Sequence, residues 1–108
     1  MFKNEVAEFI YKRTYSRWLE EENRREDWPE TIERFIGFVI SERPDIPEKT
    51  ISKIRKYMTE FAVMPSMRFL WAAGPAAKFD NTCIYNCSFA KINCVESFAE
   101  CLYILMCG

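Results

Sequence analysis

The amino-acid sequence predicts an α+β fold in which helices come first and a single strand and a last helix follow. Three observations predict this order. Apolar residues recur every three or four positions in the first two-thirds of the chain, the period of a helix with one buried face. Residues 83–92 alternate instead, in the manner of a half-buried strand. Residues 95–106 then return to the helical period.

The first expected helix carries one apolar stripe, which we expect to face the core. A charged segment, residues 20–26, is interpreted as the exit from this helix. The stripe consists of Val6, Phe9 and Ile10 and continues less regularly with Tyr15, Trp18 and Leu19.

The second and third helices are predicted by regular stripes and by matching starts. Asp27-Trp28-Pro29-Glu30 and Asp45-Ile46-Pro47-Glu48 share the pattern Asp-x-Pro-Glu. This pattern is typical of a capping box, in which the first carboxylate accepts from first-turn N–H groups and the glutamate reaches back. Proline is tolerated there because its missing N–H has no intrahelical partner. The stripes are Ile32, Phe35, Ile36, Val39 and Ile40, then Ile51, Ile54, Met58 and Phe61.

The last third of the chain is expected to be less regular. Pro65 should end the third helix, because the residue before a proline is disfavoured in the α conformation. Residues 66–81 show no period. In the strand that follows, alternation places Tyr85, Cys87 and Phe89 on one face. The final helix is predicted by Val95, Phe98, Leu102, Leu105 and Met106.

Composition limits the classes of function. A chain of 108 residues is one domain or less. With 15 basic and 16 acidic side chains, its net charge of −1 provides no general attraction to nucleic acid or to a membrane surface. No apolar run approaches the roughly 18 residues that cross a bilayer. Because the start also lacks the pattern of a signal peptide, we expect a cytoplasmic protein without nucleic-acid or membrane partners.

The chain has five cysteines, all in its last quarter, and no histidine. Without a secretory signal, a disulfide framework is not expected. Cys83 and Cys87 would lie ~13 Å apart on an extended strand at ~3.3 Å per residue, too far to share a metal ion or a disulfide. The later cysteines lack CxxC spacing, so a metal module is the weaker alternative and we expect no metal ligands. From the strand alone, Cys87 is most simply a small buried residue.

Five separated segments change that interpretation of Cys87. They are Arg13-Thr14-Tyr15-Ser16-Arg17-Trp18, Met64-Pro65-Ser66-Met67-Arg68, Trp71-Ala72-Ala73-Gly74, Asn86-Cys87-Ser88-Phe89 and Tyr103-Ile104-Leu105-Met106-Cys107-Gly108. In order and rough spacing they resemble the N-terminal region of class II, monomeric-type, adenosylcobalamin-dependent ribonucleoside-triphosphate reductases. The resemblance extends from Tyr11 to Gly108 and is more specific than any one segment.

The resemblance implies a fold and a reaction. Residues 1–63 would form an N-terminal helical region, and residues 64–108 would begin a ten-stranded α/β barrel with its first strand and helix. The reaction would convert ribonucleoside triphosphates to 2′-deoxyribonucleotides for DNA replication by thiyl-radical chemistry started from adenosylcobalamin. Cys87 would be one half of a redox-active disulfide that a thioredoxin-like protein reduces. Ser66 and Asn86 would bind the substrate.

The same resemblance implies that the chain is the first part of a longer reductase and is inactive alone. The cobalamin site and the partner of Cys87 would lie in the remainder of the reductase chain. A strand without partner strands is also not a stable domain. The alternative is a small helical protein-interaction domain without catalysis, which would fold stably by itself.

Overall fold

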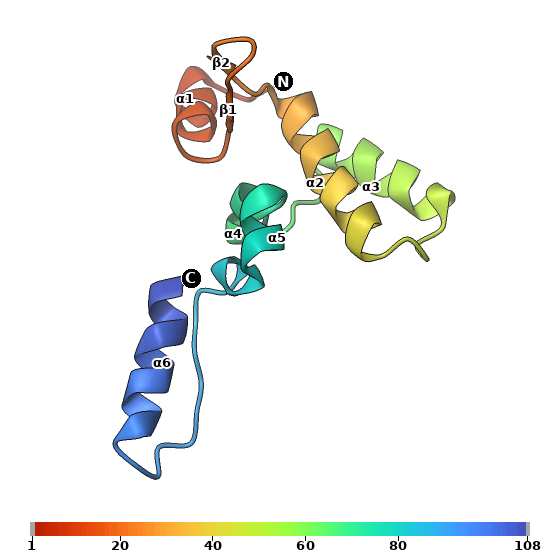
Figure 1. The fold of residues 1–108 in the computed structure, drawn as a ribbon. Helices are drawn as coiled ribbons and strands as arrows, with labels where there is room; N and C mark the ends of the chain where they lie inside the picture. The colour runs from red at the N-terminus through yellow and green to blue at the C-terminus, as the bar shows by residue number, and fades with distance from the viewer. Residues whose placement is uncertain (1, 108) are drawn as a thin grey trace.

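The computed structural model describes residues 2–107 and is mostly helical, with one two-stranded antiparallel sheet. Figure 1 shows α2 and α3 side by side, α1 and the strand pair at one end of α2, and α6 set apart from the other elements. Within residues 2–107, no helix combines the length and apolar character that a bilayer crossing requires. The elements are α1 (Glu5–Thr14), β1 (Trp18–Leu19), β2 (Arg24–Arg25), α2 (Trp28–Glu42), α3 (Glu48–Thr59), α4 (Met67–Ala72), α5 (Pro75–Phe79), the 3₁₀ helix η1 (Asn81–Ile84) and α6 (Glu96–Cys107).

The two central helices confirm most of the periodic stripes, although Ile40 near the end of α2 is 39% exposed. Ile32 and Ile36 of α2 and Ile51 and Met58 of α3 are almost completely buried and belong to one core. The start of α2 also follows the expected chemistry, because the backbone N–H of Asp27 donates to Glu30 at 2.7 Å. Helix α2 therefore has both a regular buried face and a defined first turn.

The matching capping prediction for α3 is wrong. Pro47 is the N-cap residue and supplies no capping side chain. Asp45 instead accepts two hydrogen bonds from Arg43, each of 2.9 Å. These bonds lower the pKa of Asp45 to about 2. The identical Asp-x-Pro-Glu pattern thus serves different local structures: Asp45 pairs with Arg43, whereas the arginine at the same spacing before Asp27, Arg25, donates to the carbonyl of Ser16.

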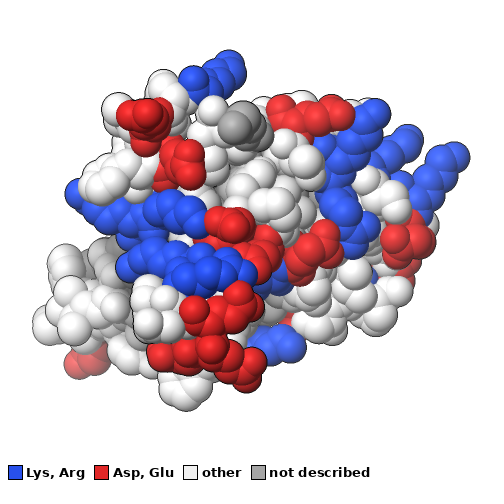
Figure 2. Space-filling model, turned by 90° about the horizontal axis from the view of Figure 1, so that it is seen from above, with Lys and Arg blue, Asp and Glu red and all other residues white. Residues whose placement is uncertain are grey.

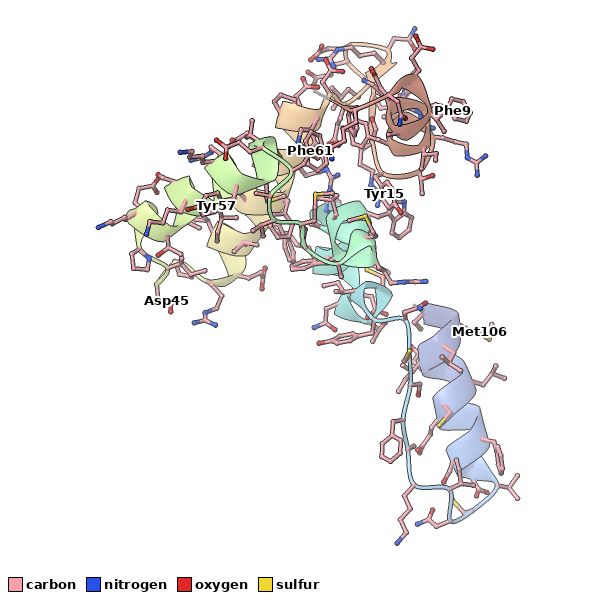
Figure 3. The ribbon with its side chains drawn as sticks, turned by 180° about the vertical axis from the view of Figure 1, so that it is seen from behind. Phe9, Tyr15, Asp45, Tyr57, Phe61 and Met106 are labelled. Carbon is pink, nitrogen blue, oxygen red and sulfur yellow. The ribbon has the colours of Figure 1, made fainter. Side chains whose placement is uncertain are left out.

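Helix α1 ends at Thr14, and the strand pair that follows, β1 just before the charged segment and β2 within it, was not predicted from the sequence. Asn23 adopts a left-handed conformation in its turn, with φ of 51°. The first part of the predicted stripe, Val6, Phe9 and Ile10, does not face the core, although Tyr15 packs against it: Phe9 is 62% exposed and points away from the other elements (Figure 3). Tyr11 is buried instead, stacked on Phe2 and in edge contact with Trp28.

The segment expected to be irregular contains short helices. Helix α3 ends at Thr59, well before Pro65, and Phe61 has a left-handed φ of 56°. Helices α4 and α5 follow, separated by Gly74, whose φ of 117° suits a residue without a Cβ. The ring of Phe69 in α4 packs edge-on against Phe35 and Phe38 of α2. This contact holds α4 on the central pair.

The predicted strand over residues 83–92 is wrong for this chain. Its start belongs to η1, and within residues 2–107 the segment 85–93 pairs with no other strand. Alternation predicts an extended segment, but a strand also requires a partner for its backbone groups. Helix α6 is confirmed, although its apolar face is open: Val95 is 80% and Met106 is 77% exposed. A barrel is not observed in the described residues.

Candidate functional site

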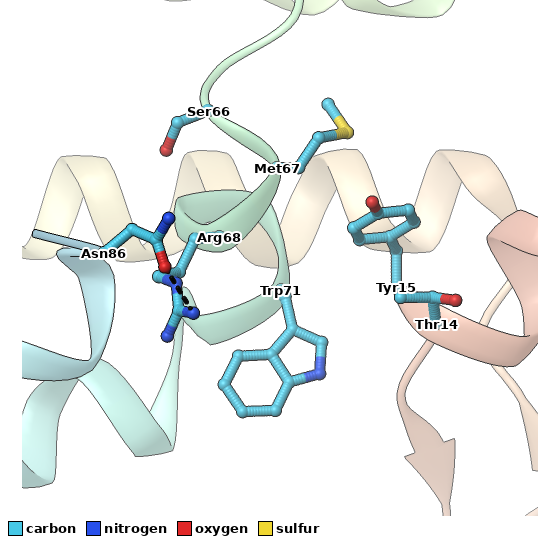
Figure 4. A pocket seen from close by; sticks show the side chains of 7 residues that line it. All are labelled: Thr14, Tyr15, Ser66, Met67, Arg68, Trp71 and Asn86. Carbon is cyan, nitrogen blue, oxygen red and sulfur yellow. Dashed lines mark hydrogen bonds between the residues drawn. The ribbon is translucent and has the colours of Figure 1, made fainter. Parts of the chain in front are cut away.

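The two residues expected to bind substrate line the same pocket. Ser66 lies at the start of α4, and Asn86 follows η1, yet both face a pocket of about 560 Å³ (Figure 4). Thr14 and Tyr15 close it from the end of α1. The remaining lining residues, Met67, Arg68 and Trp71, come from α4. The pocket therefore joins four of the five segments that carry the family resemblance.

Ser66 is the N-cap residue of α4. Its Oγ accepts a hydrogen bond from the backbone N–H of Phe69 at 3.1 Å, which stabilises the first turn. A hydroxyl that accepts in this way keeps its O–H available as a donor. The capping role and a role in ligand binding are thus compatible at this position.

Arg68 was not expected at the site. Among the residues that line the pocket, it is the one that carries a positive charge. Its Nη2 donates to Oδ1 of Asn86 at 2.9 Å (Figure 4). This bond connects α4 to a segment without strand pairing. The sequence contains Arg68 in one of the segments listed for the resemblance, but spacing alone does not bring residues 68 and 86 together.

Cys87 directly follows Asn86, and its side chain is exposed. It does not line the pocket. Cys83 is half-buried and packs against the core, and Cys94 lies 3.2 Å from the hydroxyl of Ser97. In the part of the chain that the structure describes, all five cysteines are free, and no three His, Cys, Asp or Glu residues are grouped to hold a metal ion. Cys87 is therefore an accessible thiol beside the pocket.

The segment Arg13–Trp18 has a structural role that the sequence did not reveal. Arg17 donates from Nη2 to the carbonyl of Trp71 at 2.6 Å, and its guanidinium lies 4.3 Å from the centre of the Trp71 ring. Burial, followed by the nearby charge of Arg34, lowers the pKa of Arg17. This contact fixes the wall of the pocket that Trp71 provides.

A buried ion pair, Glu26–Arg34, holds the backbone on both sides of Trp71 in place. Glu26 accepts hydrogen bonds from Arg34 at 2.7 and 3.1 Å and from Thr31 at 2.8 Å. Arg34 in turn donates to the carbonyls of Leu70 and Ala73. Burial raises the pKa of Glu26, but the bonds from Arg34, the Arg17 backbone and Thr31 outweigh it, so the net pKa is lowered. The sequence analysis interpreted Glu26 only as part of the charged exit from the first helix and missed this role.

The surface charges around these elements are mixed. Figure 2 shows basic and acidic side chains interspersed over one face. Arg24 pairs with Glu22 and Glu30, and Lys12 pairs with Asp27. This face offers no extended surface of one sign to a polyanion.

Comparisons with known proteins identify a family and several relatives that match most of the chain. Residues 1–75 match the model of the family described as ribonucleotide reductase alpha domain. The adenosylcobalamin-dependent ribonucleoside-triphosphate reductase of Levilactobacillus brevis is 33% identical over 101 residues, which cover 82% of this chain and 14% of that protein. The protein of the same name from Lactobacillus gasseri is 34% identical over 100 residues, which cover 82% of this chain and 13% of that protein. No solved structure matches the chain.

The chain thus spans about a seventh of the length of these curated relatives. The family match includes α1 to α4, the buried pair Glu26–Arg34 and Ser66. The matches to the relatives cover 82% of the chain. Because the family model covers more than half of the sequence, the chain belongs to the ribonucleotide reductase alpha domain family.

Proposed function

We propose that this chain is the N-terminal part of an adenosylcobalamin-dependent ribonucleoside-triphosphate reductase, a cytoplasmic enzyme that supplies deoxyribonucleotides for DNA replication. The observation that carries the proposal is the shared pocket of Ser66 and Asn86, with the exposed thiol of Cys87 next in sequence. The names of the curated relatives supply the reaction class. The alternative of a helical interaction domain without catalysis has no support from the family match.

In the proposed reaction, Cys87 is one of two thiols that reduce the ribose. The C2′–O bond breaks, the 2′-hydroxyl leaves as water and a hydrogen atom takes its place. The two thiols together lose two electrons and two protons as their S–S bond forms. A disulfide requires the two Cβ atoms to lie about 3.8 Å apart, so the second cysteine must be held against residue 87 by the remainder of the chain. A thioredoxin-like reductant then restores the thiols.

Ser66 and Asn86 are proposed to bind the nucleotide. The hydroxyl of Ser66 and the carboxamide of Asn86 face a pocket that also contains the ring of Trp71. Its volume of about 560 Å³ lies within the roughly 300–1,000 Å³ range of small-ligand sites. The pocket is open, so walls from the remainder of the reductase would have to complete it.

The described residues do not fit adenosylcobalamin. The pocket at Ser66, of about 560 Å³, is small for a corrin and its adenosyl and nucleotide groups. We assign the cobalamin site, and the radical chemistry that it starts, to the remainder of the reductase. The isolated chain is therefore expected to be inactive and to bind neither nucleotide nor cobalamin with useful affinity.

The proposal divides the chain into an N-terminal helical region, residues 1–63, and the beginning of the catalytic barrel, residues 64–108. Arg34 and Phe35 of α2 contact α4 across this division. The open apolar face of α6 and the unpaired segment 85–93 would be covered by later barrel elements. The first barrel strand would then form when its partner strands are present.

Replacing Cys87 with serine in the complete reductase tests the proposed function. Serine nearly preserves the volume but cannot form a disulfide, so multiple-turnover reduction should fall by at least about a thousandfold while the unfolding midpoint is unchanged. Cys83→Ser is the matched control, and it should retain turnover. Full activity of Cys87→Ser would refute the proposed role, and loss of turnover in Cys83→Ser alone would move the redox thiol to residue 83.

A further inference from the structure

We infer that Arg68 is a positioning residue, which orients the carboxamide of Asn86 and so makes the pocket a binding site for an acceptor-rich anionic group. The inference rests on the proposed function and extends it, because it assigns a role to a residue that does not itself carry the chemistry.

The first step is the direction of the hydrogen bond. A guanidinium has donors and no acceptor, so it bonds only to the oxygen of a carboxamide. The Nη2 of Arg68 lies 2.9 Å from Oδ1 of Asn86. The bond therefore holds the only acceptor atom of the Asn86 side chain towards Arg68 and leaves its two amide hydrogens for other partners. Without Arg68, the carboxamide would be able to turn and present its oxygen to the pocket.

The second step is the set of groups that the pocket then presents. Ser66 uses its oxygen to accept from Phe69, which leaves its O–H as a donor. Asn86 contributes the N–H groups of Nδ2, which Arg68 directs through its bond to Oδ1. No acidic side chain lines the pocket. These donors on one side, with Trp71 and Tyr15 beside them (Figure 4), suit a ligand with anionic oxygens next to a flat or apolar part.

The third step is the rigidity of the support. Arg68 is half-buried on α4, and Arg34 holds this helix by donating to the carbonyls of Leu70, within it, and of Ala73, directly after it. Segment 85–93 has no strand partner in residues 2–107, so the bond from Arg68 is a side-chain link between Asn86 and the packed helices. Because Cys87 follows directly, the same bond also limits the positions of that thiol.

A double-mutant cycle in the complete reductase tests the inference. The variants are Arg68→Met, Asn86→Ala and the double variant, with KM for a ribonucleoside triphosphate and kcat measured separately. Each single variant should raise KM about tenfold, the size of one charge-assisted hydrogen bond. If Arg68 acts through Asn86, adding Arg68→Met to Asn86→Ala should change KM by less than about twofold.

Two further variants separate positioning from general damage. Arg68→Lys keeps a donor and should bring KM back to within about threefold of the parent value. Arg13→Met removes an exposed arginine outside the pocket and should leave KM, kcat and the unfolding midpoint unchanged.

An unchanged KM in Arg68→Met would overturn the inference. A double variant whose KM is a further tenfold higher than that of Asn86→Ala would also overturn it, because Arg68 would then contact the ligand itself. Neither result depends on Cys87: the proposed function fails only if Cys87→Ser remains active, so the two failures are distinguishable.

Discussion

The chain contains two regions of opposite character, the N-terminal scaffold of residues 2–84 and the C-terminal arm of residues 85–107. Every buried hydrophobic core residue, from Tyr11 to Ala77, belongs to the scaffold. In the arm only Ser97 is buried, while Phe89 is 96% exposed. The radius of gyration of 16.6 Å exceeds the about 13 Å of a compact domain of this length. The stable part and the part with the candidate redox thiol are therefore different parts of the chain.

This difference indicates where the chain depends on other protein. Burying one large apolar side chain contributes about 1.5–3 kcal/mol. The arm leaves Phe98, Leu102, Leu105 and other large side chains more than half exposed, which soluble proteins avoid over a continuous surface. Figure 3 shows Met106 on α6, far from the aromatic residue Phe61 of the scaffold. The scaffold can be stable by itself, whereas the arm requires a covering surface.

The largest expected contrast is between two leucines. Leu70 is 1% exposed and Leu102 is 58% exposed. Leu70→Ala should lower the free energy of unfolding by about 2–5 kcal/mol because it leaves a cavity. Leu102→Ala should change it by less than about 0.5 kcal/mol. Urea unfolding of the 108-residue chain measures both, and equal losses would show that the arm has a core of its own.

Hydrogen exchange should resolve the same boundary along the backbone. Amides in residues 32–40 and 51–61 should exchange at least about a hundredfold more slowly than those in residues 83–92, because only the former lie in packed helices. The measurement requires a monomer, since association through the arm would protect it. Slow exchange throughout residues 83–92 in a monomer would contradict the comparison and the proposal of a barrel fragment.

The smallest expected effect is the acid dependence of the scaffold. The pKa of Glu26 in the folded chain lies below its ordinary value of 4.5, so the unfolded chain binds more protons below that pH. The stabilisation from Glu26 is therefore complete above pH 4.5 and is lost as the pH falls through its folded pKa. One pKa unit corresponds to about 1.4 kcal/mol.

Glu26→Gln should lower the free energy of unfolding at pH 7. It should also make that free energy less dependent on pH below 4.5. Glu33→Gln is the matched control, because Glu33 pairs with Arg55 on the surface, where an ion pair contributes little. Denaturation curves between pH 3 and pH 7 give both slopes. Equal slopes for the parent chain and Glu26→Gln would refute the assigned lowering of the Glu26 pKa.

Sequence reasoning predicted the elements whose signals are local. The stripes of α2, α3 and α6 and the turn at Asp27 depend on residues within a few positions of one another. It failed where a partner decides the result. Alternation in residues 83–92 was interpreted as a strand, but the segment has no neighbouring strand to pair with. In α1 the face that packs on the core is the one with Tyr11, whose hydroxyl lies 2.6 Å from that of Thr31.

The candidate site shows the same limit. Ser66 and Asn86 were expected from the resemblance, but their common pocket was not. Nor was the bond between Arg68 and Asn86, which connects positions 18 residues apart. Glu26 was interpreted only as part of the charged exit, residues 20–26. Its burial follows from Arg34 and Thr31, which reach it only when α2 is folded.

The bonds around Glu26 have a consequence for the order in which the protein is made. Its partners lie close in sequence: Thr31 is 5 residues away, Arg34 is 8, Ser16 is 10 and Tyr11 is 15. Contacts over such short loops form quickly, because little chain entropy is lost in closing them. Domains fold from the N-terminus during synthesis, at roughly 5–20 residues per second. The scaffold can therefore assemble while the ribosome is still translating, and present Trp71 and Arg68 as a finished template on which later segments dock.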